Sequence, residues 1–178
     1  DSIEARKATM ACAKTKDPTY IRLAREKTPV MTTDATPFEI GKAQIFFEPT
    51  HTGKGETRAD VGIISTGALT YKAVKVAQAL EKEGKKVKVL HIATVKPLDE
   101  DAVWRLGHEA GAIVSVEEHQ IAGGLGSAVA ETVAKHFPVP MEFIGVKDLF
   151  GQSGTPDELL EYEGISSKSI ISEVKKLI

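Results

Sequence analysis

From residue 59 onward the sequence alternates short apolar stretches with longer amphipathic ones, and this alternation restricts the fold more than any other feature. Four stretches are apolar on both faces, as strands covered on both sides are: DVGIIST, KKVKVLHIA, AIVSVE and PMEFIGV. The segments between them place apolar residues at helical spacing, as at Leu69, Ala73, Val76, Ala77 and Leu80. We therefore predict an α/β fold with a small, doubly wound, mostly parallel sheet.

Capping residues mark the ends of several predicted helices. Asp99 comes shortly after a proline and is the expected cap of a short helix. Thr155 and Glu158 have the spacing of a capping box, with Pro156 in the first turn and Gly164 as the stop. The last thirteen residues carry one apolar stripe and predict a closing helix.

Residues 1–58 do not follow this alternation. We predict a helix with Ser2 as its cap that ends near Lys16, followed by a short strand at residues 19–23. One helix and one strand cannot bury both of their faces, so we expect this unit to complete a sheet whose other strands lie outside the sequence. Residues 34–58 are rich in Pro, Thr and Gly, with one strand-like stretch at 40–47, and are interpreted as an interdomain linker.

Composition limits the class of protein. The chain has 178 residues, 42% of them hydrophobic, which is enough for a real core. A net charge of -2 gives no overall attraction to nucleic acid or anionic lipid, and the longest apolar runs are far below the roughly 18 residues that span a membrane. The lone Cys12 cannot form an internal disulfide and fits a reducing compartment. We expect a cytoplasmic protein that binds neither nucleic acid nor membrane.

The stretch VEEHQIAGGLGSAVAE, residues 116–131, places acidic residues and a histidine before a glycine-rich turn. Gly124 and Gly126 match part of a dinucleotide fingerprint, but Val129 occupies the third glycine position. We favour a corner that lets a helix pack close to the sheet over a phosphate-binding loop.

Glu117, Glu118 and His119 follow a predicted strand at the edge where open α/β sheets usually bind ligands. Adjacent residues of an extended chain point in opposite directions, so the two glutamates are a poor general acid and base pair. We expect these residues to accept hydrogen bonds from the N–H groups of the loop or to face a partner chain.

Two other stretches resemble known binding motifs but lack a residue that the motif requires. HTGKGET at residues 51–57 lacks the Ser or Thr that follows the lysine of a P-loop, because Gly55 follows Lys54. His108, in HEAG, lacks the second histidine of a zinc-binding helix. We predict no metal site in this chain.

Arg22, Arg25 and Lys27 crowd the end of the predicted strand at residues 19–23. The guanidinium of arginine binds phosphate through two parallel hydrogen bonds, and a strand end fixes its approach. A surface ion pair with Glu26 explains the same residues equally well. Both interpretations remain open on these residues alone.

Taken together, four stretches resemble the carboxyl-terminal part of a transketolase, in particular the separately encoded C-terminal half of split transketolases. They are PTYIRLAREKTPV, GIISTGALTYKAVKVAQALEKEGKKVKVLHIATVKPLD, VEEHQIAGGLGSAVAE and GQSGTPDELLEYEGIS. The resemblance covers nearly the whole chain. 1-Deoxy-D-xylulose-5-phosphate synthase and the beta subunits of 2-oxoacid dehydrogenases are similar in outline and are the rival families.

The resemblance implies three parts. Residues 1–33 would end a pyrimidine-binding domain, residues 34–58 would be a linker, and residues 59–178 would form the transketolase C-terminal domain. Transketolases transfer a two-carbon ketol unit between sugar phosphates, as in the pentose phosphate pathway of carbohydrate metabolism. They use thiamine diphosphate and a divalent metal, magnesium or calcium.

The same resemblance implies that this chain is an incomplete enzyme. The activating glutamate and the G-D-G…N cofactor motif do not occur in it, so we expect no catalytic, cofactor-binding or metal-binding residue here and no activity from the chain alone. The expected partner is an N-terminal transketolase subunit or domain, in a homodimer or a heterotetramer of two subunit types. The C-terminal domain would help to hold the dimer together, away from the cofactor.

One residue role carries over from the family. The arginine that binds the substrate phosphate, in an S-R or A-R element after the last strand of the pyrimidine-binding domain, falls on Arg25. Arg22 is a weaker candidate because it matches only some relatives. The alternative of a different class is a non-catalytic binding or regulatory α/β module that uses residues 117–126.

Overall fold

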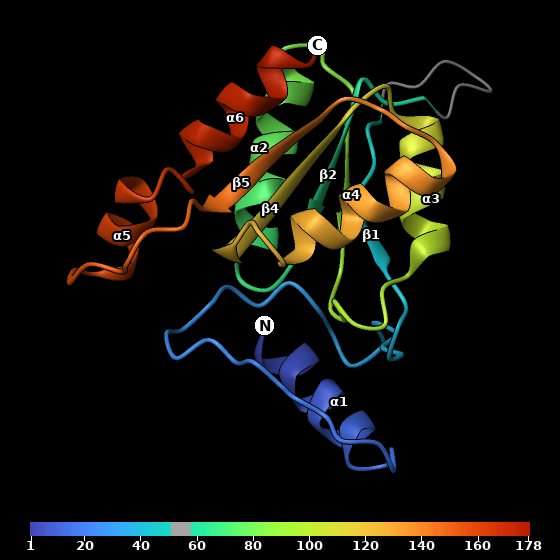
Figure 1. Ribbon diagram of the computed structural model, residues 1–178, viewed down its shortest axis with the longest axis vertical. Helices are drawn as coiled ribbons and strands as arrows, with labels where there is room; N and C mark the ends of the chain where they lie inside the picture. Colours follow the sequence, from blue (N-terminus) through green and yellow to red (C-terminus); the bar gives the residue numbers. More distant parts are fainter. Residues whose placement is uncertain (51–57) are drawn as a thin grey trace.

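The computed structural model describes residues 1–50 and 58–178, and its body is one sheet with helices on both faces (Figure 1). The five strands lie in the order β1-β3-β2-β4-β5. Their bounds are β1 (Gln44–Phe47), β2 (Val61–Ser65), β3 (Val87–His91), β4 (Ile113–Gln120) and β5 (Met141–Val146). β1 runs antiparallel to β3, and the other four strands are mutually parallel. The prediction of a mostly parallel, doubly wound sheet is confirmed.

Two helical layers cover the sheet because successive strand residues point to opposite faces. On one face, Ile63 of β2 packs with apolar residues of α2 (Leu69–Lys82) and α6 (Ser167–Lys176). On the other, the next residue, Ile64, packs with α3 (Glu100–Glu109) and α4 (Leu125–His136). All five residues of β2 and of β3 are buried, including the polar Lys88 and His91 of β3.

The helix ends agree with the capping residues in most places. Asp99 accepts a hydrogen bond from the N–H of Ala102, and the Thr155–Glu158 capping box opens α5 (Pro156–Tyr162). The prediction for α1 (Ser2–Cys12) was wrong at both ends. Asp1, one residue earlier than Ser2, is the cap because its carboxylate accepts from two backbone N–H groups. The helix also ends before Lys16, and a turn and Pro18 follow.

The predicted strand at residues 19–23 is wrong for the structure of this chain. These residues form no strand, and no described strand lies beside them to complete a ladder of hydrogen bonds. Their apolar side chains stay in solvent, with Tyr20 87% exposed and Leu23 61% exposed. The strand expected at residues 40–47 is shorter, and as β1 it forms the edge of the sheet beside β3. The boundaries of the three predicted parts stay a prediction.

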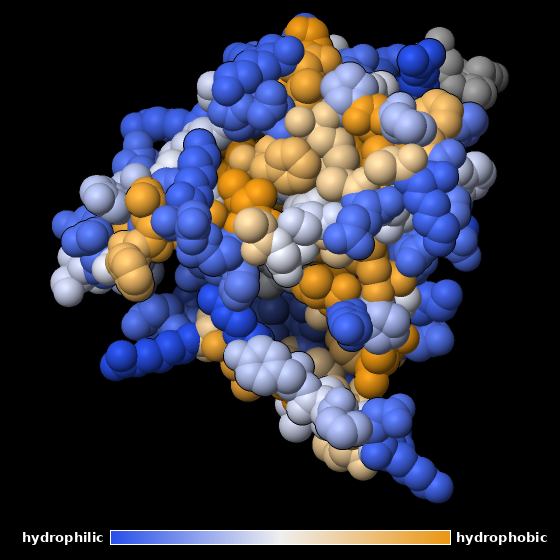
Figure 2. All heavy atoms as spheres, in the orientation of Figure 1, coloured by the Kyte–Doolittle hydropathy of each residue, from blue (hydrophilic) through white to orange (hydrophobic). Residues whose placement is uncertain are grey.

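The N-terminal segment, residues 1–36, lies at the edge of the sheet where the parallel strands end (Figure 1). In the space-filling view a recess separates much of this segment from the rest of the molecule (Figure 2). No residue of α1 is buried. The segment therefore depends on a small number of contacts with the sheet.

Replacement of Gly62 by Ala should destabilise the domain, because α3 lies too close to β2 for a side chain there. An added Cβ would come within 2.7 Å of Leu106 Cγ. We expect Gly62→Ala to lower the free energy of unfolding by about 1–3 kcal/mol, measured by urea unfolding. Gly107→Ala is the matched control, since its Cβ would meet only Ile113 Cδ1 at 3.6 Å. Because Gly107 lies within helix α3, Gly107→Ala should raise the free energy of unfolding by up to about 1 kcal/mol. Equal effects of both changes would contradict the packing argument.

Candidate functional site

Three groups with functional potential lie at the carboxyl edge of the sheet. They are the glycine corner between β4 and α4, the beginning of α2 after β2, and His91 at the end of β3. Open α/β sheets bind their ligands at this edge, because helix N-termini and loop groups converge there.

The glycine corner holds an internal carboxylate. Glu117, near the end of β4, is 2% exposed and accepts hydrogen bonds from the N–H groups of Leu125, at 2.7 Å, and Gly126, at 2.8 Å. These N–H groups begin α4 and would otherwise be free to bind an anion. Burial raises the pKa of Glu117, and the two N–H hydrogen bonds act in the opposite direction. The expectation that this residue bonds to the N–H groups of its own loop is confirmed.

The glycines of the corner are there for close packing. A Cβ on Gly124 would lie 2.2 Å from the carbonyl oxygen of Gln120 and from Glu117 Oε2. A Cβ on Gly126 would lie 2.8 Å from the Phe143 ring and from Ser115 Oγ. Side chains longer than hydrogen therefore cannot fit between α4 and the sheet, and the packing interpretation is confirmed.

Glu118 and His119 differ from their neighbour. Both side chains are exposed. The only contact described for the His119 ring is a long one, 3.4 Å from Nδ1 to the carbonyl oxygen of Gln120. The hypothesis that these residues face a partner chain stays a prediction.

A second arrangement was not foreseen from the sequence. Ser65 Oγ donates to Thr70 Oγ1 at 3.0 Å, Thr70 Oγ1 lies 2.8 Å from His91 Nδ1, and His91 Nε2 lies 2.9 and 3.0 Å from the carboxylate oxygens of Glu4. Burial opposes ionisation of Glu4, but the hydrogen bond and the charge of His91 outweigh it and lower its pKa. The available signal was one histidine inside the otherwise apolar end of the stretch KVKVLHIA.

Arg22 and Arg25 lie on the arginine loop, residues 13–30, which joins α1 to the end of the N-terminal segment (Figure 1). Both side chains are exposed. Neither arginine has a hydrogen bond or an ion pair with any described residue, so the pair with Glu26 does not form here. The guanidinium of each is free to bind an external anion.

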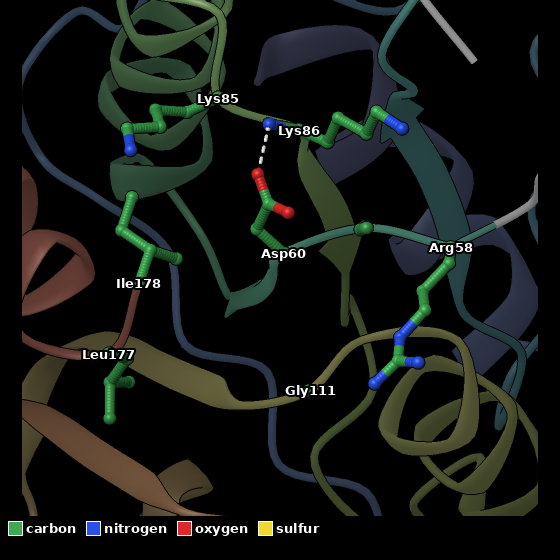
Figure 3. Close-up of a pocket in the computed structure, with 8 residues that line it drawn as sticks. Arg58, Asp60, Lys85, Lys86, Gly111, Leu177 and Ile178 are labelled. Carbon is green, nitrogen blue, oxygen red and sulfur yellow. Dashed lines mark hydrogen bonds between the residues drawn. The ribbon is translucent and has the colours of Figure 1, made fainter. Parts of the chain in front are cut away.

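A hollow of about 560 Å³ lies at the opposite, amino edge of the sheet (Figure 3). Arg58, Lys85 and Lys86 line it together with Asp60, whose carboxylate accepts from the N–H of Lys86 at 2.8 Å. Figure 3 shows the Lys86 side chain directed away from Asp60, while Arg58 and Lys85 lie on opposite sides of the hollow. The cations do not converge, so we do not assign an anion site here.

Two further properties bear on ligands. Among residues 1–50 and 58–178, no group of three or more His, Cys, Asp or Glu side chains is placed to hold a metal ion. In the same residues, every helix is too short or too polar to cross a bilayer.

Comparison with known proteins identifies the family. Residues 53–170 match the family model for the transketolase C-terminal domain. The chain belongs to this family. The resemblance noted in the sequence is thereby confirmed, and so is the fold class.

Relatives of the transketolase family match almost the full chain. A 6-deoxy-6-sulfo-D-fructose transketolase subunit, SqwH, from Clostridium sp. (strain MSTE9) is 36% identical over 96% of this chain and 50% of its own length. An apulose-4-phosphate transketolase subunit from Phocaeicola vulgatus is 31% identical over 96% of this chain and 52% of its own. This transketolase-family chain thus spans about half the length of the curated relatives it matches.

A solved structure agrees. A split-gene transketolase, described as an inactive beta4 tetramer, superposes with a TM-score of 0.90 at 34% identity. The match covers 99% of this chain and 55% of that one. It therefore includes the N-terminal segment as well as the sheet.

Replacement of Glu117 by Gln tests its role at the start of α4. The amide would direct an N–H donor at a backbone N–H donor and leave that group without an acceptor. We expect Glu117→Gln to lower the free energy of unfolding by about 1–3 kcal/mol in urea. Glu118→Gln, on the exposed next residue, should change it by less than about 0.5 kcal/mol. If the two variants unfold at the same urea concentration, the start of α4 does not depend on Glu117.

Proposed function

We propose that this chain is the C-terminal part of a thiamine-diphosphate-dependent transketolase that transfers a two-carbon ketol unit between sugar phosphates. The observation that carries the proposal is the match to transketolase subunits over 96% of the chain. The remaining part of the enzyme would come from an N-terminal transketolase subunit or domain. We propose further that Arg25 binds the substrate phosphate.

The surroundings of Arg25 support this role. Its guanidinium is exposed, and no described residue neutralises it. Both ends of the arginine loop are held by α1. Residue 13 follows the helix directly, and the Asp1 carboxylate at the start of the helix accepts from the N–H groups of Met31 at 2.6 Å and Thr32 at 2.7 Å. A planar cation on a braced loop can bind a tetrahedral anion through two parallel hydrogen bonds.

We propose that thiamine diphosphate and its metal ion bind outside this chain. In support, no group of three or more His, Cys, Asp or Glu side chains among residues 1–50 and 58–178 is placed to hold a metal ion. We therefore assign cofactor binding to the other part of the assembly, where thiamine diphosphate would stabilise the carbanion of the transferred unit. The contribution proposed for this chain is to bind the charged end of the sugar and thereby orient its reacting end.

The names of two relatives narrow the class of substrate. One names a sugar with a sulfo group, and the other names a sugar with a phosphate. Both groups are tetrahedral anions that an arginine can bind. We propose a sugar with an anionic terminal group as the substrate of this assembly, with phosphate as the first choice.

Activity should depend on assembly. The full-length polypeptide mixed with its N-terminal partner and thiamine diphosphate should transfer ketol units between phosphorylated sugars, whereas either component alone should not. Product formation followed by mass spectrometry is the measurement. Release of carbon dioxide from pyruvate and glyceraldehyde 3-phosphate would instead indicate a 1-deoxy-D-xylulose-5-phosphate synthase and would contradict the proposal.

Replacement of Arg25 should affect phosphorylated substrates selectively. Charge-assisted hydrogen bonds contribute about 1.5–3 kcal/mol, so Arg25→Ala should raise KM for a phosphorylated sugar by about 10- to 100-fold. Steady-state kinetics with the unphosphorylated sugar should show little change. Lys27→Ala, on the same loop, is the matched control, and Arg22→Ala tests the weaker candidate. An equal loss with both kinds of sugar would rule out the phosphate role.

A further inference from the structure

Residues of the sheet and of α2 orient the imidazole of His91 independently of its contact with α1. Ser65 donates its hydroxyl hydrogen to Thr70, and Thr70 Oγ1 lies 2.8 Å from His91 Nδ1. A carboxylate can only accept, so His91 Nε2 carries a proton and donates it to Glu4. The Phe46 ring packs on the imidazole at a centroid distance of 4.6 Å. His91 is thus a donor held in position at the carboxyl edge of the sheet.

Burial makes this contact specific. Ser65, Thr70 and His91 are each at most 2% exposed, and the Glu4 side chain is 14% exposed. A buried imidazole N–H without an acceptor is costly, and so is a buried carboxylate without a donor. The N-terminal segment therefore has one favoured position on the sheet, in which Glu4 is hydrogen-bonded to His91.

The remaining polar contacts of the N-terminal segment are internal. The Asp1 carboxylate binds the backbone at residues 31 and 32, and Lys7 Nζ donates to the carbonyl oxygen of Thr33 at 2.6 Å. Among the described residues, the bond from Glu4 to His91 is the only hydrogen bond between α1 and the strands of the sheet. Met31 adds apolar contact with the core. Internal hydrogen bonds thus hold the N-terminal segment together. Its orientation relative to the sheet depends mainly on the hydrogen bond between Glu4 and His91.

We propose that Glu4 and His91 are positioning residues for the arginine loop. Their contact fixes α1 on the sheet, and α1 fixes the ends of the loop that carries Arg25. A shift of about 1 Å in a group that orients a substrate can cost up to about 100-fold in rate. The inference extends the proposed function, because it rests on Arg25 binding the charged end of the substrate.

The contact itself can be tested without an activity assay. Hydrogen exchange of residues 1–33 would be followed in the full-length polypeptide assembled with its N-terminal partner. Glu4→Ala and His91→Ala should each speed exchange by about tenfold or more. The double variant should be no faster than either single variant, because both changes remove the same bond. Unchanged exchange in the single variants would overturn the proposal.

Two variants separate positioning from general damage. Arg6→Ala is the matched control, since Arg6 lies on the same helix and pairs with Asp34 in solvent, away from the sheet. It should leave exchange unchanged. His91→Gln retains an N–H donor toward Glu4 and should restore most of the protection that His91→Ala loses. Equal effects of Arg6→Ala and Glu4→Ala would also overturn the proposal.

Kinetics then tests the link to the arginine loop. Glu4→Ala should raise KM for phosphorylated sugars roughly fivefold or more, with little change in kcat or in KM for unphosphorylated sugars. An equal loss with both substrates, or no loss with either, would overturn the positioning role. If Arg25→Ala leaves KM for phosphorylated sugars unchanged, the proposed function of Arg25 fails. The exchange experiment still decides whether Glu4 and His91 hold the segment.

Discussion

The burial of a parallel sheet on both faces is the constraint on which the rest of the structure depends. Strands such as β2 have no polar face, so α2 and α6 must cover one side and α3 and α4 the other. This arrangement places all the carboxyl ends of the parallel strands at one edge. Glu117 and His91 both lie near this edge. Glu117 bonds to the start of α4, and His91 bonds to Glu4 of α1.

The two polar arrangements at that edge have different consequences. Glu117 satisfies the first N–H groups of α4, and the position where a phosphate could bind is already filled by the protein. His91 instead directs its N–H outward, to a residue that lies 87 positions earlier in the chain. The first arrangement stabilises the turn between β4 and α4 within the domain. The second joins the domain to the segment that carries Arg22 and Arg25, which are exposed and have no partner among the described residues.

The incomplete surroundings of the N-terminal segment fit its family. Its helix buries no residue, and residues 19–23 have the composition of a strand without a described neighbour. The chain spans about half the length of the curated relatives it matches. The C-terminal domain has a core of its own, whereas the N-terminal segment has polar contacts and one apolar anchor, Met31.

Local interactions are what the sequence determined by itself. The Asp99 cap, the Thr155–Glu158 box and the alternating strands and helices follow from neighbouring residues, so they could be predicted. The absence of a strand at residues 19–23 and the bond from His91 to Glu4 could not. Each depends on which distant groups come together, because a ladder or a buried hydrogen bond needs a partner brought close by the folded chain. The tertiary structure alone decided these.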